Sequence, residues 1–133
     1  MRIGLDTSVV VRLLTGEPAA LAALAARRVA AAVERGAEVV VSDLVVAETY
    51  FALQHHYGLT KAQALGSLGE MFRTSPLIPI DATQTVLAVR NLAAARPGFV
   101  DRLVHAGYAA RSAEMWTFEK SASRLSSVEV LGG

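Results

Sequence analysis

The chain of 133 residues contains no cysteine, and this absence removes several kinds of chemistry. Disulfide bonds, cysteine-ligated zinc and thiol catalysis are all excluded. Lysine is also scarce, since Lys61 and Lys120 are the only two lysines beside eleven arginines. Arginine suits phosphate oxygens because its donors form a planar fork, but an alanine- and arginine-rich composition can also reflect genomic base composition. The basic residues alone therefore identify no partner.

A strong charge excess and long apolar runs are missing as well. The net charge is +1, hydrophobic residues make up 53% and the mean hydropathy is +0.38, so the chain can bury a core and is not a disordered tail. Asp6 interrupts the N-terminal apolar stretch before it reaches signal-peptide length. The alanine-rich segment after Pro18 carries Arg27 and Arg28, which is atypical of a membrane span. We expect a soluble, cytoplasmic protein without a membrane partner.

Short apolar segments of strand character alternate with segments of helical character along the chain. We predict strands at 2–5, 38–41, 77–80, 115–118 and 127–131, and helices at 7–14, 18–35, 42–57, 60–73, 81–96 and 99–111. Asp81 and Gln84 have the spacing of a capping box for the helix that follows them. This alternation predicts a parallel sheet covered on both faces. We therefore expect an α/β fold in which residues 1–133 form a single-domain three-layer α/β/α sandwich with a mostly parallel central sheet.

Several carboxylates stand where predicted strands end and helices begin. Asp6 follows the first strand, which is often central in such sheets, and Glu119 follows the strand at 115–118. Asp101 begins a helix after Gly98. Open α/β sheets place their chemistry at the carboxyl ends of the strands. Helix capping and an interaction with the helix dipole are alternative roles for Asp6 and Asp101.

Glu48 lies within a nearly continuous apolar and aromatic stretch, residues 44–50. Burying a carboxylate there is costly unless the group is paired or binds a metal. An ion pair with an arginine and a metal site both satisfy this condition. As a set, the four acids are the oxygen ligands that hard divalent cations prefer. No nucleophile–base pair is evident, so a covalent intermediate is not required.

Two other classes of acidic α/β protein fit poorly. A receiver-like signalling domain needs an acidic pair after its first strand and a separate lysine late in the chain. Here Asp6 is followed by Thr7 and Ser8, and Lys120 lies next to Glu119. A phosphatase with a nucleophilic aspartate needs a second aspartate two residues later, where this chain has Ser8.

Four stretches of the sequence resemble the motifs of the PIN domain. They are Asp6-Thr7-Ser8-Val9-Val10, Val41 to Glu48, Phe99-Val100-Asp101-Arg102-Leu103 and Trp116-Thr117-Phe118-Glu119-Lys120. They follow the order and spacing of that family over essentially the whole chain, and they are most similar to the VapC-type toxins of prokaryotic toxin–antitoxin pairs.

This resemblance implies a metal-dependent endoribonuclease that hydrolyses RNA phosphodiester bonds, with tRNA or ribosomal RNA as possible targets. One or two Mg²⁺ or Mn²⁺ ions would be held by Asp6, Glu48, Asp101 and Glu119 as the catalytic set. Ser8 and Thr117 would orient carboxylates and waters. The family usually has aspartate at the fourth position, and Glu119 reaches one methylene further. A cognate antitoxin and a homodimer are further expectations. The alternative is a catalytically weak or inactive PIN domain that acts as an RNA- or partner-binding module.

The remaining polar and aromatic residues receive simpler interpretations. Arg12, Arg102 and Lys120 are candidates for binding substrate phosphates, with a solvated charge as the alternative for each. Asp43 and Asp81 are predicted helix caps, although both also follow strands. We predict a structural histidine at position 105. The aromatic side chains are predicted to pack in the core or in a dimer interface and not to stack on bases (Tyr50, Phe51, Trp116, Phe118).

Overall fold

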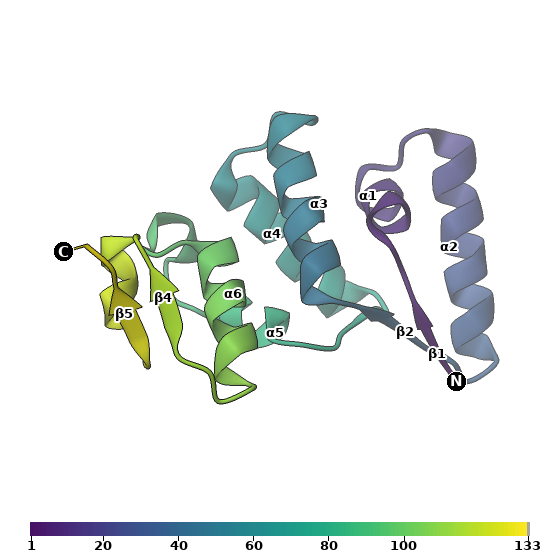
Figure 1. Ribbon diagram of the computed structural model, residues 1–133. Helices are drawn as coiled ribbons and strands as arrows, with labels where there is room; N and C mark the ends of the chain where they lie inside the picture. The colour runs from purple at the N-terminus through teal and green to yellow at the C-terminus, as the bar shows by residue number, and fades with distance from the viewer. Residues whose placement is uncertain (133) are drawn as a thin grey trace. The chain divides into compact units, whose positions relative to one another are not determined.

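A computed structural model describes residues 1–132 of the protein, which form two compact units. The first unit is Met1–Thr83 and the second begins at Gln84. The first unit contains β1 (Arg2–Gly4), α1 (Thr7–Thr15), α2 (Ala19–Glu34), β2 (Glu38–Val41), α3 (Asp43–His55), α4 (Lys61–Thr74) and β3 (Ile78–Pro79) (Figure 1). After α5 (Thr83–Leu87), which begins where this unit ends, the second unit contains the 3-10 helix η1 (Leu92–Ala94), α6 (Phe99–Ala109), β4 (Met115–Thr117), the 3-10 helix η2 (Lys120–Arg124) and β5 (Val128–Val130).

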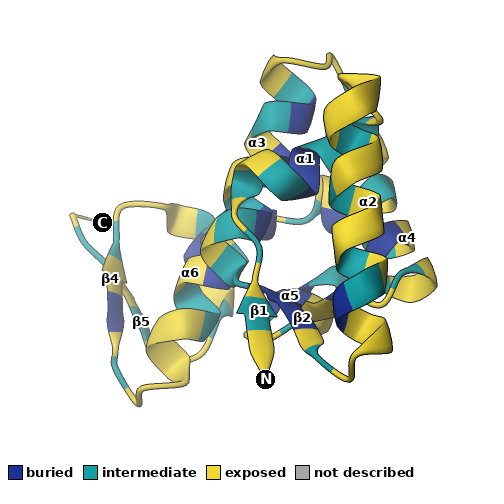
Figure 2. Cartoon of the chain, turned by 90° about the vertical axis from the view of Figure 1, so that its right-hand side faces the viewer, coloured by how far each residue is buried: buried dark blue, intermediate teal, exposed yellow. Residues whose placement is uncertain are grey.

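The sheet of the first unit is parallel and has the strand order β1-β2-β3. β2 is the central strand and is a run of valines, of which Val39, Val40 and Val41 are at most 7% exposed. Figure 2 shows this strand as buried, while most of α2 is exposed. A fully buried valine stabilises the fold by about 1.5–3 kcal/mol. In the strand order β1-β2-β3, the first strand lies at the edge of the hydrogen-bonded sheet. The expectation that the first strand is central was therefore wrong.

Local sequence signals explain where α3 and α4 begin. Ser42 caps α3 by accepting a hydrogen bond from the backbone N–H of Val45 at 3.4 Å. Thr60 and Gln63 form a reciprocal capping box at the start of α4, with bonds of 3.1 and 2.9 Å. The buried faces of these helices complete the core of the unit through Val46, Tyr50, Leu53, Ala64, Leu68 and Met71.

The second unit is smaller and is built from α6 and a two-stranded parallel sheet. Met115 of β4 is in register with Val128 of β5, and Thr117 is in register with Val130. Phe99 and Leu103 of α6, Met115 of β4 and Ala122 of η2 are buried and form its core. This core keeps the N-terminus of α6 and the end of β4 within one small unit, and these segments carry Asp101 and Glu119.

The segment 81–96 does not form the single helix that we predicted. Asp81 accepts a hydrogen bond from the backbone N–H of Asp43 at 3.0 Å, and the Asp43 carboxylate accepts bonds from the Thr83 hydroxyl and N–H at 2.6 and 3.0 Å. The helix is limited to Thr83–Leu87. Asn91 then has a left-handed conformation with φ of 53°, which a continuous helix cannot accommodate. Asp81 thus anchors the start of α3.

Three of the four aromatic side chains that were predicted to be in the core or an interface are exposed. Tyr50 is buried, as predicted, but Phe51, Trp116 and Phe118 are 45%, 66% and 78% exposed. A core position was therefore wrong for these three, and a dimer interface stays a prediction. His105 has the structural role that we predicted, since its Nε2 contacts the carbonyl oxygen of Ser126 at 2.7 Å.

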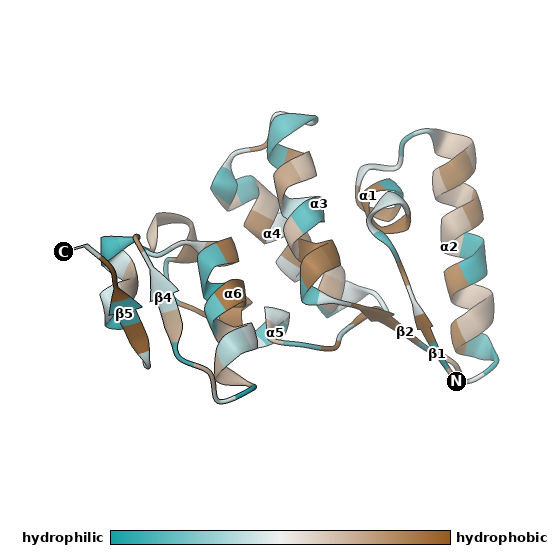
Figure 3. Ribbon diagram, viewed as in Figure 1, coloured by the Kyte–Doolittle hydropathy of each residue, from teal (hydrophilic) through white to brown (hydrophobic). Residues whose placement is uncertain are grey.

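The predicted α/β class with parallel sheets is confirmed, and the hydrogen-bonded strands form a three-stranded and a two-stranded sheet. That residues 1–133 behave as a single domain stays a prediction. Figure 3 shows β2 as strongly hydrophobic, whereas α2 is mostly of intermediate hydropathy with a few hydrophilic positions. Among residues 1–132, no single helix has the length and hydropathy to cross a membrane. α1 and α2 meet the length and hydropathy requirement only when they are taken together, and a bend of 108° separates the two helices.

Candidate functional site

Asp6 lies at the N-terminus of α1 and caps this helix with its own carboxylate. Its Oδ1 accepts a hydrogen bond from the Ser8 hydroxyl at 2.6 Å and from the Ser8 backbone N–H at 2.8 Å. These two bonds hold the pKa of Asp6 below its ordinary value of 3.8. The side chain is exposed, so Asp6 is an ionised carboxylate at neutral pH that faces solvent. Ser8 thus contacts Asp6, and its role beside a bound metal stays a prediction.

Glu48 lies on α3 and is exposed, which differs from the burial that its apolar neighbours predicted. The reason is helical geometry, because Val46, Thr49 and Tyr50 occupy the buried face of α3 and Glu48 lies on the opposite face. The Glu48 carboxylate accepts a hydrogen bond from the Thr7 hydroxyl at 2.7 Å. Among the described residues it forms no ion pair with an arginine. The first residue of α1 therefore links Glu48 to the segment that carries Asp6.

Asp101 and Glu119 line one small hollow of the second unit, about 180 Å³ in volume. We call it the α6–β4 hollow, and its other lining residues are Val104, Tyr108, Met115, Trp116, Thr117 and Ala122. Both carboxylates are exposed. The Thr117 hydroxyl accepts a hydrogen bond from the backbone N–H of Glu119 at 3.0 Å, so it positions the main chain at Glu119 and not the carboxylate.

Ser121 holds the carboxylate of Glu119. Oε1 of Glu119 accepts bonds from the Ser121 hydroxyl at 2.8 Å and from its backbone N–H at 3.1 Å, and these bonds hold the pKa of Glu119 below its ordinary value of 4.5. Asp6 and Ser8 have the same arrangement. In both places a carboxylate caps a helix and a serine two residues later donates twice to one oxygen. The spacing acid-x-Ser is visible in the sequence and could have identified Ser121.

Thr7 is the other functional residue that sequence reasoning missed. Its hydrogen bond joins it to Glu48, 41 positions away, so no local sequence pattern predicts the contact. Its position next to Asp6 is the only available signal, because a hydroxyl beside a candidate ligand is a common partner of a second carboxylate.

The three basic candidates differ in whether their side chains already form hydrogen bonds with the protein backbone. Arg12 donates to the carbonyl oxygen of Ser8 at 2.9 Å, and Arg102 donates through Nε to the carbonyl oxygen of Pro97 at 2.7 Å. Both are half-buried. Lys120 is exposed and directly follows Glu119. A role in binding phosphate stays a prediction for each of the three.

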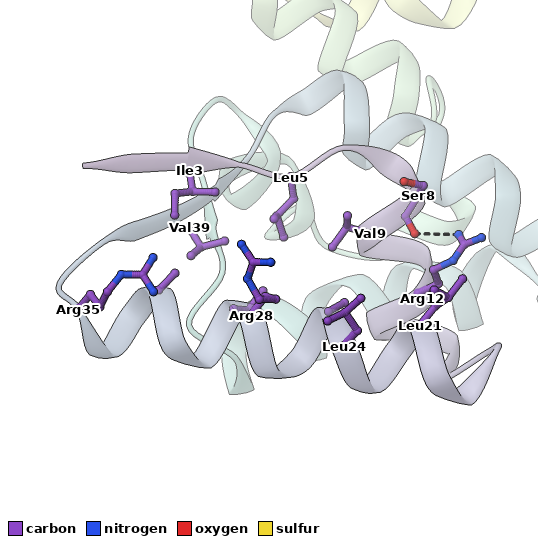
Figure 4. A pocket seen from close by; sticks show the side chains of 13 residues that line it. Ile3, Leu5, Ser8, Val9, Arg12, Leu21, Leu24, Arg28, Arg35 and Val39 are labelled. Atoms are coloured by element: carbon purple, nitrogen blue, oxygen red, sulfur yellow. Dashed lines mark hydrogen bonds between the residues drawn. The ribbon is translucent and has the colours of Figure 1, made fainter.

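A larger apolar groove lies between α1, α2 and the strands of the first unit and has a volume of about 500 Å³. We call it the α1–α2 groove. In Figure 4, Ile3, Leu5, Val9 and Val39 form one side of the groove, and Leu21 and Leu24 of α2 form the other. Arg12 of α1, Arg28 of α2 and Arg35, which directly follows α2, also line the groove. The combination of an apolar lining with three cations distinguishes this groove from the acidic α6–β4 hollow.

The carboxylates occur as two pairs, with Asp6 and Glu48 in the first unit and Asp101 and Glu119 in the second. In the described part of the chain, no group of three or more Asp, Glu, His or Cys residues forms a ready metal site. The donor chemistry of each pair nevertheless suits a hard cation, because all of the side-chain ligands are carboxylate oxygens. Each pair therefore offers two exposed carboxylate groups as ligands for such an ion.

Comparison with known proteins adds an independent finding. No curated protein and no solved structure matches the chain. The PIN domain family, in contrast, matches residues 3–126, which include both pairs of carboxylates and nearly the whole sequence. The chain therefore belongs to the PIN domain family.

Proposed function

We propose that the protein is a metal-dependent endoribonuclease and the toxin of a toxin–antitoxin pair. PIN domains are generally nucleases, so the family assignment supports hydrolysis of nucleic-acid phosphodiesters. The observation that carries the proposal is the pair of acid-x-Ser turns, which fix the direction of the exposed carboxylates of Asp6 and Glu119 and lower their pKa. Ionised oxygen donors are what a hard divalent cation requires.

Asp6, Glu48, Asp101 and Glu119 are proposed to hold one or two Mg²⁺ or Mn²⁺ ions. When bound, such an ion lowers the pKa of a coordinated water and neutralises charge on the phosphate. The contribution of the protein is to keep the carboxylates in place, through the Thr7 hydroxyl at Glu48 and the Ser8 and Ser121 hydroxyls at the two turns. Because Glu119 is longer than aspartate, we propose that its contact with the ion is either direct or through a water.

The antitoxin is proposed to bind in the α1–α2 groove. An amphipathic segment with apolar and acidic side chains complements this surface, because the groove is apolar and carries Arg12, Arg28 and Arg35. Leu24 is 45% exposed there. Leu24→Asp should abolish antitoxin binding in a pull-down from co-expressing cells and leave RNA cleavage unchanged. Loss of both would show instead that the substitution unfolds the protein. A homodimer is also proposed and is tested by light scattering.

The decisive experiment is cleavage of total cellular RNA by the purified wild type and by Asp101→Asn, with Mg²⁺ and with EDTA. Discrete fragments that require both the metal and Asp101 would establish the ribonuclease, and mapping of their ends would identify the tRNA or ribosomal RNA target. Glu34→Gln, which removes an exposed carboxylate at the end of α2, is the matched control and should cut like the wild type.

A second candidate function is an RNA- or partner-binding module that does not cut. It is favoured by the fourth acidic position, where Glu119 stands in place of the aspartate that is usual in the family. In the same experiment, this candidate predicts intact RNA in every lane while the protein still retains RNA or a protein partner on a column.

A further inference from the structure

The chain has a single tryptophan, and this side chain is exposed beside one pair of carboxylates. Trp116 is 66% exposed on β4, between the buried Met115 and the half-buried Thr117. Its indole Nε1 donates to Glu114 Oε1 at 2.9 Å. The polar edge of the ring is thereby satisfied, while most of the ring remains in water. A large apolar ring in solvent is costly, and such residues often mark a binding surface.

A second aromatic ring lines the same hollow from the opposite element. Asp101, Val104 and Tyr108 follow one another at the spacing of one helix face of α6, and all three line the α6–β4 hollow with Trp116 and Glu119. Tyr108 and Val104 are each 48% exposed. The hollow therefore combines two exposed rings with two of the carboxylates of this unit, Asp101 and Glu119.

The dimensions and charges of this region favour one class of occupant. The hollow, of about 180 Å³, is smaller than the 300–1,000 Å³ of ordinary ligand pockets, so it suits one ring system and not a whole small molecule. Residues 84–133 carry six Arg or Lys and four Asp or Glu, so this unit has a small excess of positive charge, although Asp101, Glu114 and Glu119 lie in or beside the hollow. A polyanion whose separate rings can each enter a hollow of this size is a nucleic-acid strand with unpaired bases.

We propose that Trp116 and Tyr108 form a stacking platform that holds one unpaired base of the substrate at the α6–β4 hollow. The inference rests on the proposed function and extends it to the residues that hold the substrate. A base in a duplex has both faces covered by its neighbours, so it cannot stack on these rings. A base held on Trp116 would bring its own backbone to Asp101 and Glu119, because the rings and carboxylates line one hollow.

The single tryptophan makes the proposal directly measurable, since all tryptophan fluorescence comes from position 116. The full chain is studied in EDTA, which prevents metal-dependent cleavage. We expect acrylamide to quench the free protein strongly. A single-stranded oligoribonucleotide of about eight nucleotides should change the emission and shield the ring from acrylamide, whereas the same sequence as a blunt duplex should do neither.

Substitutions then separate stacking from general binding. Trp116→Ala should weaken single-strand binding, measured by anisotropy of a labelled strand, by about tenfold or more, and Trp116→Phe should restore most of it. Tyr108→Ala should also weaken binding, and it serves as the second variant if Trp116→Ala does not fold. Mn²⁺ affinity, measured separately, should stay unchanged in all three variants because neither ring is a proposed ligand.

Three results would overturn the platform. One is a Trp116 ring already shielded from acrylamide in the free monomer. Another is equal binding of single strand and duplex. The third is shielding that depends only on protein concentration, which would assign Trp116 to an interface between two copies. Each of these is independent of cleavage, so a failed platform is distinguishable from a failed nuclease, which would instead show no metal-dependent cutting.

Discussion

At the scale of single residues, the candidate site depends on short hydroxyl–carboxylate contacts. Ser8 and Ser121 each donate twice to one carboxylate oxygen, and Thr7 donates once to Glu48. Hydrogen bonds to the charged form lower a carboxyl pKa and orient the group. Ser8 and Ser121 therefore lower the pKa of Asp6 and Glu119, and all three hydroxyls orient the carboxylates that they contact, although none of the three residues is itself acidic.

Ser121→Ala should raise the pKa of Glu119 towards its ordinary value of 4.5, because the hydroxyl bond is the largest cause of the lowered value. With a lowered pKa, the stabilising bonds to Glu119 are fully present above the ordinary value and are lost as the pH falls through the folded-state pKa. The variant should therefore begin to lose Mn²⁺ affinity at a higher pH than the wild type. Carboxyl carbon NMR titration measures the shift, and Ser121→Thr, which keeps a hydroxyl, is the control. An unchanged Glu119 pKa in Ser121→Ala would contradict this.

Thr49 presents the opposite case, a hydroxyl that is completely buried without a hydrogen-bond partner among the described residues. Replacing it with a methyl group of the same shape removes a desolvated polar atom. Thr49→Val should therefore raise the free energy of unfolding by about 1 kcal/mol, which urea denaturation measures. Thr49→Ala is the control for volume and should lower stability. Destabilisation by Thr49→Val would mean that the hydroxyl has a partner in solution.

At the scale of elements, Asp43 joins the start of α3 to the start of α5. Its carboxylate accepts bonds from the Ala82 N–H and from the N–H and hydroxyl of Thr83. Asp43→Ala leaves these donors without their partner, and we expect a loss of about 1–3 kcal/mol in the free energy of unfolding. Asp43→Asn, which keeps one acceptor, should lose less. If Asp43→Ala instead removed Mn²⁺ binding without loss of stability, Asp43 would belong to the metal site.

Most element boundaries were predictable because their causes are local. Gly16 ends α1 in a left-handed conformation, and Ser42 and Thr60 cap the helices that follow them. The segment 81–96 was not predictable, because Asp81 bonds to Asp43, 38 positions away, and a local capping box is only one use of an aspartate. The same reason applies to Glu48, whose partner is 41 positions away and whose exposure depends on which helix face the core selects.

At the scale of the whole molecule, the four proposed metal ligands are divided between the two units, with Asp6 and Glu48 in one and Asp101 and Glu119 in the other. A ligand at 100 times its Kd stabilises a protein by about 2.7 kcal/mol, so saturating Mn²⁺ should raise the Tm of the wild type by several degrees. If one site is shared, Asp6→Asn and Asp101→Asn should each remove nearly all of this rise, and the double variant should lose no more. Differential scanning calorimetry measures the rise, with Glu34→Gln as the control. Two half-sized, additive losses would instead show separate sites.

The alanines of α2 have a consequence for motion. Ala32 is the only fully buried residue of this helix, and besides the α1–α2 groove a second hollow of about 490 Å³ lies between α2 and α4. A helix with so little buried side-chain area opens at low free-energy cost. Backbone amides of α2 should therefore exchange with deuterium well before those of α3, which is held by Val46, Tyr50 and Leu53. A segment that covers the groove would slow this exchange, so the timing of deuterium uptake in α2 would report its arrival.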